Sequence, residues 1–350
     1  MNSLVIQNKG LVDPNDLCLI GSSTKRGDTT KIGMFGSGWK YALAWLLRNE
    51  VDIKVFAGTK EIVIDYKIVL HRNTPVRVLT VDGKQTSITA QMGPQWTGWM
   101  ALREIISNAI DEGEYKINTV FNMTPTGVDS DITTIYIPVN NELQNVVRNY
   151  EHYFAFDRKE TCSNEKGRVF LKSETSPINI YRKGVRCFDT KSNNSSMESK
   201  IDFDFNDILI NETRVADLYD IKNDIKKLVS NGVPANVLLQ CIKEGRIPNK
   251  PSIHNCDQMI ILIEQGYNFI PKIESMFMGL IHVDKESIII NDEWYKILVE
   301  KGILTAKVQI GNIMYVETNK LNLAEVDYHL KGVGLTKIKL ICGSFESYYN

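Results

Sequence analysis

Residues 102–112 read LREIISNAIDE, and this stretch decides the fold of the first part of the chain. It places Glu104, Asn108 and Asp111 at positions i, i+4 and i+7, which a helix brings within an arc of roughly 60°. Apolar residues occupy the other side, namely Trp99, Leu102, Ile105, Ile106, Ala109 and Ile110. The spacing therefore predicts a packed helix that begins near Thr97 and presents one narrow polar stripe.

The polar stripe has the chemistry of a site that activates water beside a hard cation. The carboxylate of Glu104 can accept a proton, and the amide oxygen of Asn108 can bind Mg²⁺ without adding charge. Taken alone, the same stripe is more typical of a solvated helix face than of a catalytic site. A second motif is needed to decide between these interpretations.

The second motif lies in residues 32–40, IGMFGSGWK, directly before an apolar helical run at residues 41–48. Its glycines let the backbone approach a ligand closely, and the free N–H groups at a helix start favour phosphate. The upstream residues 21–31 are small, polar and partly basic, which is typical of a mobile flap over phosphates. Without other evidence, a tight turn with a helix cap explains the glycines as well.

Together the two motifs resemble the GHKL ATPase superfamily, whose Bergerat-fold ATP site combines an ExxxNxxD helix, a DxGxG turn and a glycine-rich lid. The resemblance implies ATP and Mg²⁺ as ligands, with Glu104 as the general base, Asn108 holding Mg²⁺ and Asp111 supporting the site. The nucleotide-binding residues that it implies are Asn8, Gly10, Gly33, Gly36, Ser37, Gly38, Lys40, Thr86, Asn108 and Asp111.

The order of the motifs differs from that of ordinary family members, in which the ExxxNxxD helix precedes the lid. A circular permutation explains the difference, with the chain starting at the strand that leads into the DxGxG turn. Residues 4–7 read as that strand, and Asn8-Lys9-Gly10 takes the place of DxG, before a helix start at Pro14. Asn8 lacks the charge of the family aspartate, and Val12 replaces the second glycine, so this turn departs from the family's adenine-binding pattern at two positions.

Alternating and apolar runs predict strands at residues 52–57, 61–69, 76–81, 85–91 and 131–137. Thr86 on one of these corresponds to the family threonine beneath adenine. An antiparallel sheet covered by helices follows, so the expected fold class is α/β, in the sense of an α+β sandwich.

The length of 350 residues exceeds what this core needs. We expect a permuted Bergerat ATP-binding domain at residues 1–152 and a β-rich, transducer-like region at residues 153–232. The second region contains a hairpin through Lys183-Gly184. Residues 233–350 form a mixed α/β region without a recognisable role. Family transducer domains often supply a cation to the γ-phosphate, and Arg182, Lys183 and Arg214 are the candidates here.

Composition indicates a cytoplasmic protein, or one in a host cytoplasm if the Asn-, Ile- and Lys-rich chain is phage-encoded. A net charge of −1 does not indicate nucleic acid, and no apolar run is long enough for a membrane span. Six scattered cysteines without CxxC spacing predict reduced thiols.

Three functions remain open. The first is a Mg²⁺-dependent ATPase in which ATP closes the lid and drives conformational change or homodimerisation. The second is a switch that binds ATP or ADP without hydrolysis and acts on a protein client of unknown identity. The third is a protein kinase of the histidine-kinase type, although His152 is the only weak phosphoacceptor candidate.

Overall fold

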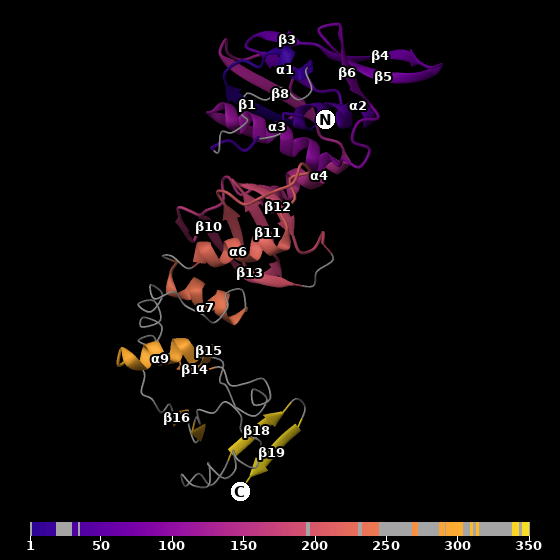
Figure 1. Cartoon of the computed structure of the whole chain (residues 1–350). Helices are drawn as coiled ribbons and strands as arrows, with labels where there is room; N and C mark the ends of the chain where they lie inside the picture. The colour runs from indigo at the N-terminus through magenta and orange to yellow at the C-terminus, as the bar shows by residue number, and fades with distance from the viewer. Residues whose placement is uncertain are drawn as a thin grey trace. The chain divides into compact units, whose positions relative to one another are not determined.

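The computed structural model describes residues 2–18, 30–33, 36–193, 197–229 and 233–244, and seven short segments, 268–271, 287–290, 292–303, 309–310, 313–314, 338–342 and 345–349. The chain separates into two compact units (Figure 1). Unit 1 comprises Met1–Arg158, Asn179–Asp189 and Leu209–Ala216, and unit 2 comprises the remainder. Unit 1 therefore contains both sequence motifs and two returning segments from later in the chain.

The main sheet of unit 1 has five antiparallel strands in the order β3-β2-β8-β1-β7. The N-terminal strand β1 lies between two strands that follow the LREIISNAIDE stretch in sequence. Its register places Ile6 opposite Ile117 on one side and Ile135 on the other. The strands are β1 (Asn2–Lys9), β2 (Lys54–Ala57), β3 (Lys60–Ile62), β7 (Tyr115–Phe121) and β8 (Ile132–Pro138).

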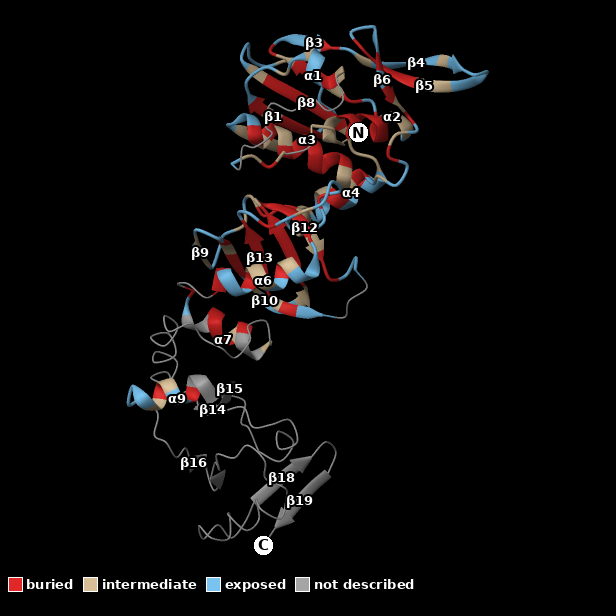
Figure 2. Cartoon of the chain, viewed as in Figure 1, coloured by how far each residue is buried: buried red, intermediate tan, exposed pale blue. Residues whose placement is uncertain are grey.

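Two apolar helices, α2 (Gly38–Arg48) and α3 (Gly98–Glu112), pack against each other, and α3 also packs on β1 and β7. They share one core with the sheet, in which Trp45 and Ile105 are almost completely buried, as Figure 2 shows for α3. Shorter helices complete the layer: α1 (Pro14–Cys18), α4 (Asn141–Arg148) and α5 (Tyr150–Tyr153). The predicted helix starts at Pro14 and Thr97 are confirmed.

The N-terminus of α3 is capped differently from the prediction. Thr97 occupies the N-cap position, but its side chain makes no cap hydrogen bond. The Glu142 carboxylate from α4 instead accepts a 2.5 Å hydrogen bond from the Gly98 N–H. A carboxylate at a helix N-terminus also interacts favourably with the helix dipole.

A second, three-stranded sheet is formed by β4 (Ile64–His71), β5 (Thr74–Val81) and β6 (Lys84–Thr89). The prediction of one strand at residues 61–69 was wrong, because the chain passes from β3 in one sheet to β4 in another. The break falls at Val63, whose N–H donates to the Asp82 carboxylate at 2.9 Å. The β4–β5 hairpin projects from the unit (Figure 1).

Two later segments belong to unit 1 as well. One is a hairpin of β11 (Asn179–Arg182) and β12 (Val185–Asp189), which turns at Lys183-Gly184 as predicted. Both turn residues have positive φ angles. The other is Leu209–Ala216. Its Ala216 N–H donates a hydrogen bond to the Cys187 carbonyl oxygen on β12 at 3.1 Å.

Unit 2 contains three antiparallel strands, β9 (Cys162–Asn164), β10 (Gly167–Pro177) and β13 (Glu198–Phe205), with β10 in the middle. Helices α6 (Leu218–Val229) and α7 (Ala235–Lys243) pack on β13. The remaining described elements are β14 (Asn268–Pro271), β15 (Ser287–Ile290), α9 (Asp292–Glu300), β16 (Gln309–Ile310), β17 (Ile313–Met314), β18 (Ile338–Cys342) and β19 (Phe345–Tyr349).

The fold class is thus mixed α and β with mainly antiparallel sheets, and only β14 and β15 pair in parallel among the described strands. Much of the predicted flap, residues 21–31, lies outside the described residues. Within the described part of the chain, no helix combines the length and apolar character that a bilayer span requires.

Ile105 tests the core of unit 1, because its side chain is fully buried between α3 and the sheet. We expect Ile105→Ala to lower the free energy of unfolding by about 2–5 kcal/mol through lost burial and a residual cavity. Urea denaturation followed by tryptophan fluorescence measures this. The exposed Val128→Ala is the control, with an expected change below about 0.5 kcal/mol; equal effects would contradict the described core.

Candidate functional site

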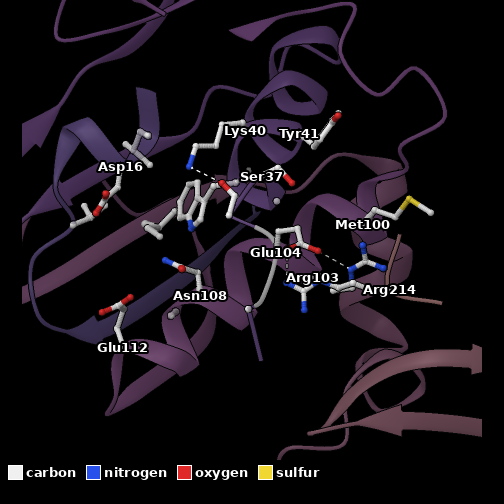
Figure 3. A pocket seen from close by; sticks show the side chains of 18 of the residues that line it. Asp16, Ser37, Lys40, Tyr41, Met100, Arg103, Glu104, Asn108, Glu112 and Arg214 are labelled. Atoms are coloured by element: carbon white, nitrogen blue, oxygen red, sulfur yellow. Dashed lines mark hydrogen bonds and ion pairs between the residues drawn. The ribbon is translucent and has the colours of Figure 1, made fainter. Parts of the chain in front are cut away.

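Unit 1 contains a cavity of about 410 Å³, within the range of small-molecule sites (Figure 3). Residues from five separate parts of the sequence line it. They are Asn8, Gly10, Leu11, Val12, Asp16 and Leu17; Gly33, Gly36, Ser37, Gly38, Trp39, Lys40 and Tyr41; Gln95, Trp96, Met100, Arg103, Glu104, Asn108, Ala109 and Glu112; Thr133 and Ile135; and Glu212, Thr213 and Arg214.

The turn after β1 forms one wall of the cavity. Asn8 is buried, and its amide nitrogen donates to the Lys9 carbonyl oxygen at 2.9 Å. Gly10 follows with a φ of +92°, which a side chain would strain. Thr133 on β8 supports the turn, because its hydroxyl donates to the Gly10 carbonyl oxygen at 2.7 Å and accepts from the Val12 N–H at 2.9 Å.

Asp111 anchors the backbone that leads into the glycine motif. Its two carboxylate oxygens accept hydrogen bonds of 2.7 Å from the N–H groups of Ile32 and Gly33. The Lys31 ammonium donates to the Asp111 carbonyl oxygen, and the Lys183 ammonium donates to the Lys31 carbonyl oxygen at 3.1 Å. Asp111 itself does not line the cavity, so it positions the motif from behind.

The start of α2 lies directly against Glu104. A Cβ at position 38 would collide with the Glu104 carboxylate, so glycine is required for this approach. Ser37 is the N-cap residue of α2 and makes no side-chain cap bond. The Lys40 ammonium donates to the Gly36 carbonyl oxygen at 3.1 Å, and burial lowers the pKa of Lys40 despite the nearby Asp16 (Figure 3).

The Glu104 carboxylate is held between two guanidinium groups. Arg103 Nε lies 3.0 Å from one carboxylate oxygen, and Arg214 Nη2 lies 2.7 Å from the other (Figure 3). Arg103 also donates to the Thr213 carbonyl oxygen at 3.2 Å, and Arg214 donates to the Ile32 carbonyl oxygen at 2.9 Å. The cluster thereby joins α3, the glycine motif and residues 209–216.

Burial opposes the ionisation of Glu104, but the two guanidinium groups outweigh it and lower the pKa of this carboxyl below its ordinary value. Burial lowers the pKa of Arg103 to about 10, although Glu104 opposes this shift. Two cations around one carboxylate leave a formal charge of +1 on this cluster alone, while Asp16, Glu112 and Glu212 line other parts of the cavity. This charge suits an anionic ligand such as a phosphate group.

Arg214 adopts an unusual backbone conformation, with a φ of +60°. The Asn211 side-chain oxygen stabilises it by accepting hydrogen bonds from the N–H groups of Thr213 and Val215, at 3.0 and 2.9 Å. Non-glycine residues held at positive φ are uncommon and are enriched at ligand sites. The loop therefore aims the Arg214 side chain at Glu104.

Asn108 lines the cavity one helical turn beyond Glu104 and is half-buried. No group of three or more Asp, Glu, His or Cys side chains in the described part of the chain is arranged to hold a metal. Mg²⁺ commonly takes only one or two protein ligands, with water and phosphate oxygens completing its shell. A single amide oxygen such as that of Asn108 could therefore serve as the one protein ligand.

Aromatic side chains cover part of the cavity wall. Tyr41 and Trp96 stack with their ring centroids 5.0 Å apart. The Trp39 indole nitrogen is buried and has no hydrogen-bond partner within the described residues. A buried N–H donor without a partner at a cavity wall is suited to a ligand acceptor.

Nine predicted residues line the cavity together: Asn8, Gly10, Gly33, Gly36, Ser37, Gly38, Lys40, Glu104 and Asn108. Thr86 on β6 does not line it, and its hydroxyl instead donates to the carbonyl oxygen of Leu79 on β5 at 2.9 Å. Thr133 lines it instead. Of the three candidate phosphate cations, Arg214 lines the cavity, whereas Arg182 and Lys183 do not.

Sequence reasoning missed Thr133, Arg103, Trp39 and Trp96 as wall residues. Arg103 directly precedes Glu104, so its place beside the carboxylate carried a signal in the sequence. The position of Thr133 depends on the pairing of β1 with β8, which no local pattern encodes.

No protein-family model matches the chain, and no curated protein is significantly similar to it in sequence. The functional assignment therefore depends on the residues and geometry of the cavity.

Asp111→Asn tests whether the carboxylate holds the glycine motif. The amide cannot accept two charge-assisted hydrogen bonds, and losing them costs about 1.5–3 kcal/mol locally. We expect the Ile32 and Gly33 amide hydrogens to exchange roughly tenfold or more faster, as measured by hydrogen–deuterium exchange. Asp129→Asn, at an exposed position, is the control. Unchanged exchange in Asp111→Asn would contradict the anchoring role.

Proposed function

We propose that unit 1 is a circularly permuted Bergerat-type domain that binds ATP with Mg²⁺ and hydrolyses it. One observation carries the proposal. Three segments chosen on their sequence alone, at residues 8–12, 32–40 and 104–111, line or anchor a single cavity of about 410 Å³. They are far apart in the chain, so their convergence is unexpected for unrelated turns and helix faces.

The order of the strands supports a permuted chain. β1 is the first element of the sequence, yet it pairs on both sides with strands that follow α3. This pairing is compatible with a permuted order of the motifs, because permutation is tolerated at surface connections.

Each wall of the cavity suits one part of a nucleotide. The turn at Asn8–Val12, supported by Thr133, offers a polar site for a base in which Asn8 and Thr133 are buried. We assign this supporting role to Thr133 in place of Thr86. The glycine motif and the start of α2 offer backbone N–H groups for phosphates. Arg214 and Lys40 place cations at the same end, and the Trp39 N–H adds an unused donor.

Hydrolysis requires a base, and Glu104 is positioned for this role with one restriction. Both of its carboxylate oxygens are engaged by guanidinium groups, and its pKa is lowered, so it is a weak base in this arrangement. A γ-phosphate competes for Arg214 and would free one carboxylate oxygen for water. Asn108 would hold Mg²⁺, which neutralises charge on the phosphates when bound.

The engagement of both Glu104 carboxylate oxygens favours one second candidate function, a switch that binds nucleotide without hydrolysing it. If Arg214 never leaves Glu104, bound ATP would set the position of residues 209–216 without being cleaved. The kinase alternative gains no such support, since the His152 ring lies against the Arg186 guanidinium and beside Tyr153. Transfer of a radioactive label from the γ-phosphate of ATP to the chain would identify a kinase.

Glu104→Ala tests the catalytic assignment. We expect Mg²⁺-dependent ATP turnover to fall by roughly 10²–10⁴-fold, because the base is lost, while nucleotide affinity remains within a fewfold of wild type. Phosphate release at saturating ATP and calorimetric titration measure the two quantities.

Glu104→Gln is the second variant, since it keeps the size of the side chain and one acceptor for the arginines. Glu114→Gln, just beyond α3 and exposed, is the control and should retain full turnover. Equal turnover in all four proteins would refute the role of Glu104. Binding without turnover in wild type would favour the switch.

Arg214→Gln tests the electrostatic coupling through the pH profile. Arg214 lowers the pKa of Glu104, so its removal raises that pKa against the opposing effect of burial. The base must be ionised, and we therefore expect the acid limb of kcat to move to higher pH. Arg214→Lys keeps the charge and should leave the limb near its wild-type position. Identical limbs in all three proteins would show that Arg214 does not act on the base.

A further inference from the structure

The β4–β5 hairpin carries an exposed apolar surface that the cavity does not use. Tyr66, Ile68 and Leu70 on β4 are 47%, 66% and 72% exposed. They alternate along the strand and so share one face of the hairpin. Figure 2 shows exposed residues along β4, away from the buried core of the unit.

β4 is also the edge of its sheet, since its only strand partner among the described residues is β5. Arg72 and Asn73 close the hairpin with φ angles of +46° and +62°, as in a two-residue turn of type I′. This turn makes His71 and Thr74 a hydrogen-bonded pair, and such pairs alternate along the ladder.

The alternation fixes which peptide groups point outward. Odd-numbered residues of this strand bond to β5, as shown by the Val63 carbonyl oxygen, which accepts from the Asp82 N–H at 2.9 Å. The Tyr66 N–H instead bonds to the neighbouring Asp65 carboxylate at 2.7 Å, as expected for a donor at the free edge. The outward-facing residues are Ile64, Tyr66, Ile68 and Leu70.

We propose that β4 pairs antiparallel with β4 of a second copy of this chain, about a two-fold axis at Ile68. The outward peptide groups of the two strands then bond to each other and join two three-stranded sheets into one of six strands. Long apolar edge strands are normally protected from such pairing by charge, proline or a covering element. β4 has no proline, and the side chains of its outward-bonding residues Ile64, Tyr66, Ile68 and Leu70 are Ile, Tyr and Leu, whereas the exposed charges of Asp65 and Lys67 lie on the other face of the strand.

Self-pairing is favoured because this register is complementary to itself. Ile68 lies opposite Ile68 of the second copy, and Tyr66 lies opposite Leu70, so these apolar side chains contact one another across the new strand pair. On the other face, the Asp65 carboxylate lies opposite the His71 imidazole, whose N–H can donate to it. Cross-strand apolar and opposite-charge pairs of this kind stabilise antiparallel sheets.

The neighbouring registers are less favourable. A two-fold axis at Lys67 would place two lysines directly opposite each other, which destabilises a ladder. An axis at Tyr66 would require Leu70 to meet Ile62, which is 1% exposed within the core of unit 1. Of these three registers, the axis at Ile68 has the best-matched contacts, and the association does not require nucleotide.

Charge reversal across the axis tests the proposal. Sedimentation velocity over a concentration series is expected to show a reversible dimer for the wild-type chain. Ile68→Lys and Ile68→Glu each place like charges face to face, so each should weaken dimerisation about 100-fold or more. An equimolar mixture of the two variants should restore a heterodimer, seen by native mass spectrometry.

Ile68→Val, which keeps the apolar contact, should dimerise like wild type, and Val128→Lys controls for added charge elsewhere on unit 1. Circular dichroism checks that the exposed substitutions leave the fold intact. A monomeric wild-type chain at tens of micromolar would overturn the proposal. So would dimers that persist in both charged variants, or a mixture that fails to associate.

Discussion

The ion cluster around Glu104 is the interaction on which the site depends. A buried carboxylate must be paired, and here it is paired by the adjacent Arg103 and by Arg214 from more than a hundred residues later. Arg214 also bonds to the carbonyl oxygen of Ile32, beside the glycine motif. Three separate segments are therefore coupled through one charge, and any ligand that attracts Arg214 would act on all of them.

Both the ion cluster and Asp111 form hydrogen bonds to the backbone of the glycine motif. Asp111 binds its N–H groups from α3, whereas Arg214 binds a carbonyl oxygen from residues 209–216. The motif is thus held from two sides beside the cavity. A buried ion cluster is costly to form, because its charges must be removed from water.

Local patterns in the sequence predicted the elements that carry the site. The spacing of Glu104, Asn108 and Asp111 predicted α3, and Pro14 and Thr97 marked helix starts that are confirmed. Local patterns could not predict which strands pair when they are distant in sequence. The strand predicted at residues 61–69 divides at Val63 between two sheets, and Thr133 reaches the cavity wall only because β8 pairs with β1. Glu104 and Asp111 are buried by segments that the helix itself does not specify.

The most direct measurement is hydrogen–deuterium exchange of the full chain with and without Mg²⁺ and a non-hydrolysable ATP analogue. The account predicts protection of backbone amides in residues 8–12, 31–41 and 104–112, with a smaller change at residues 209–216. Protection confined to other parts of the chain, or none at saturating analogue, would contradict a nucleotide site in this cavity.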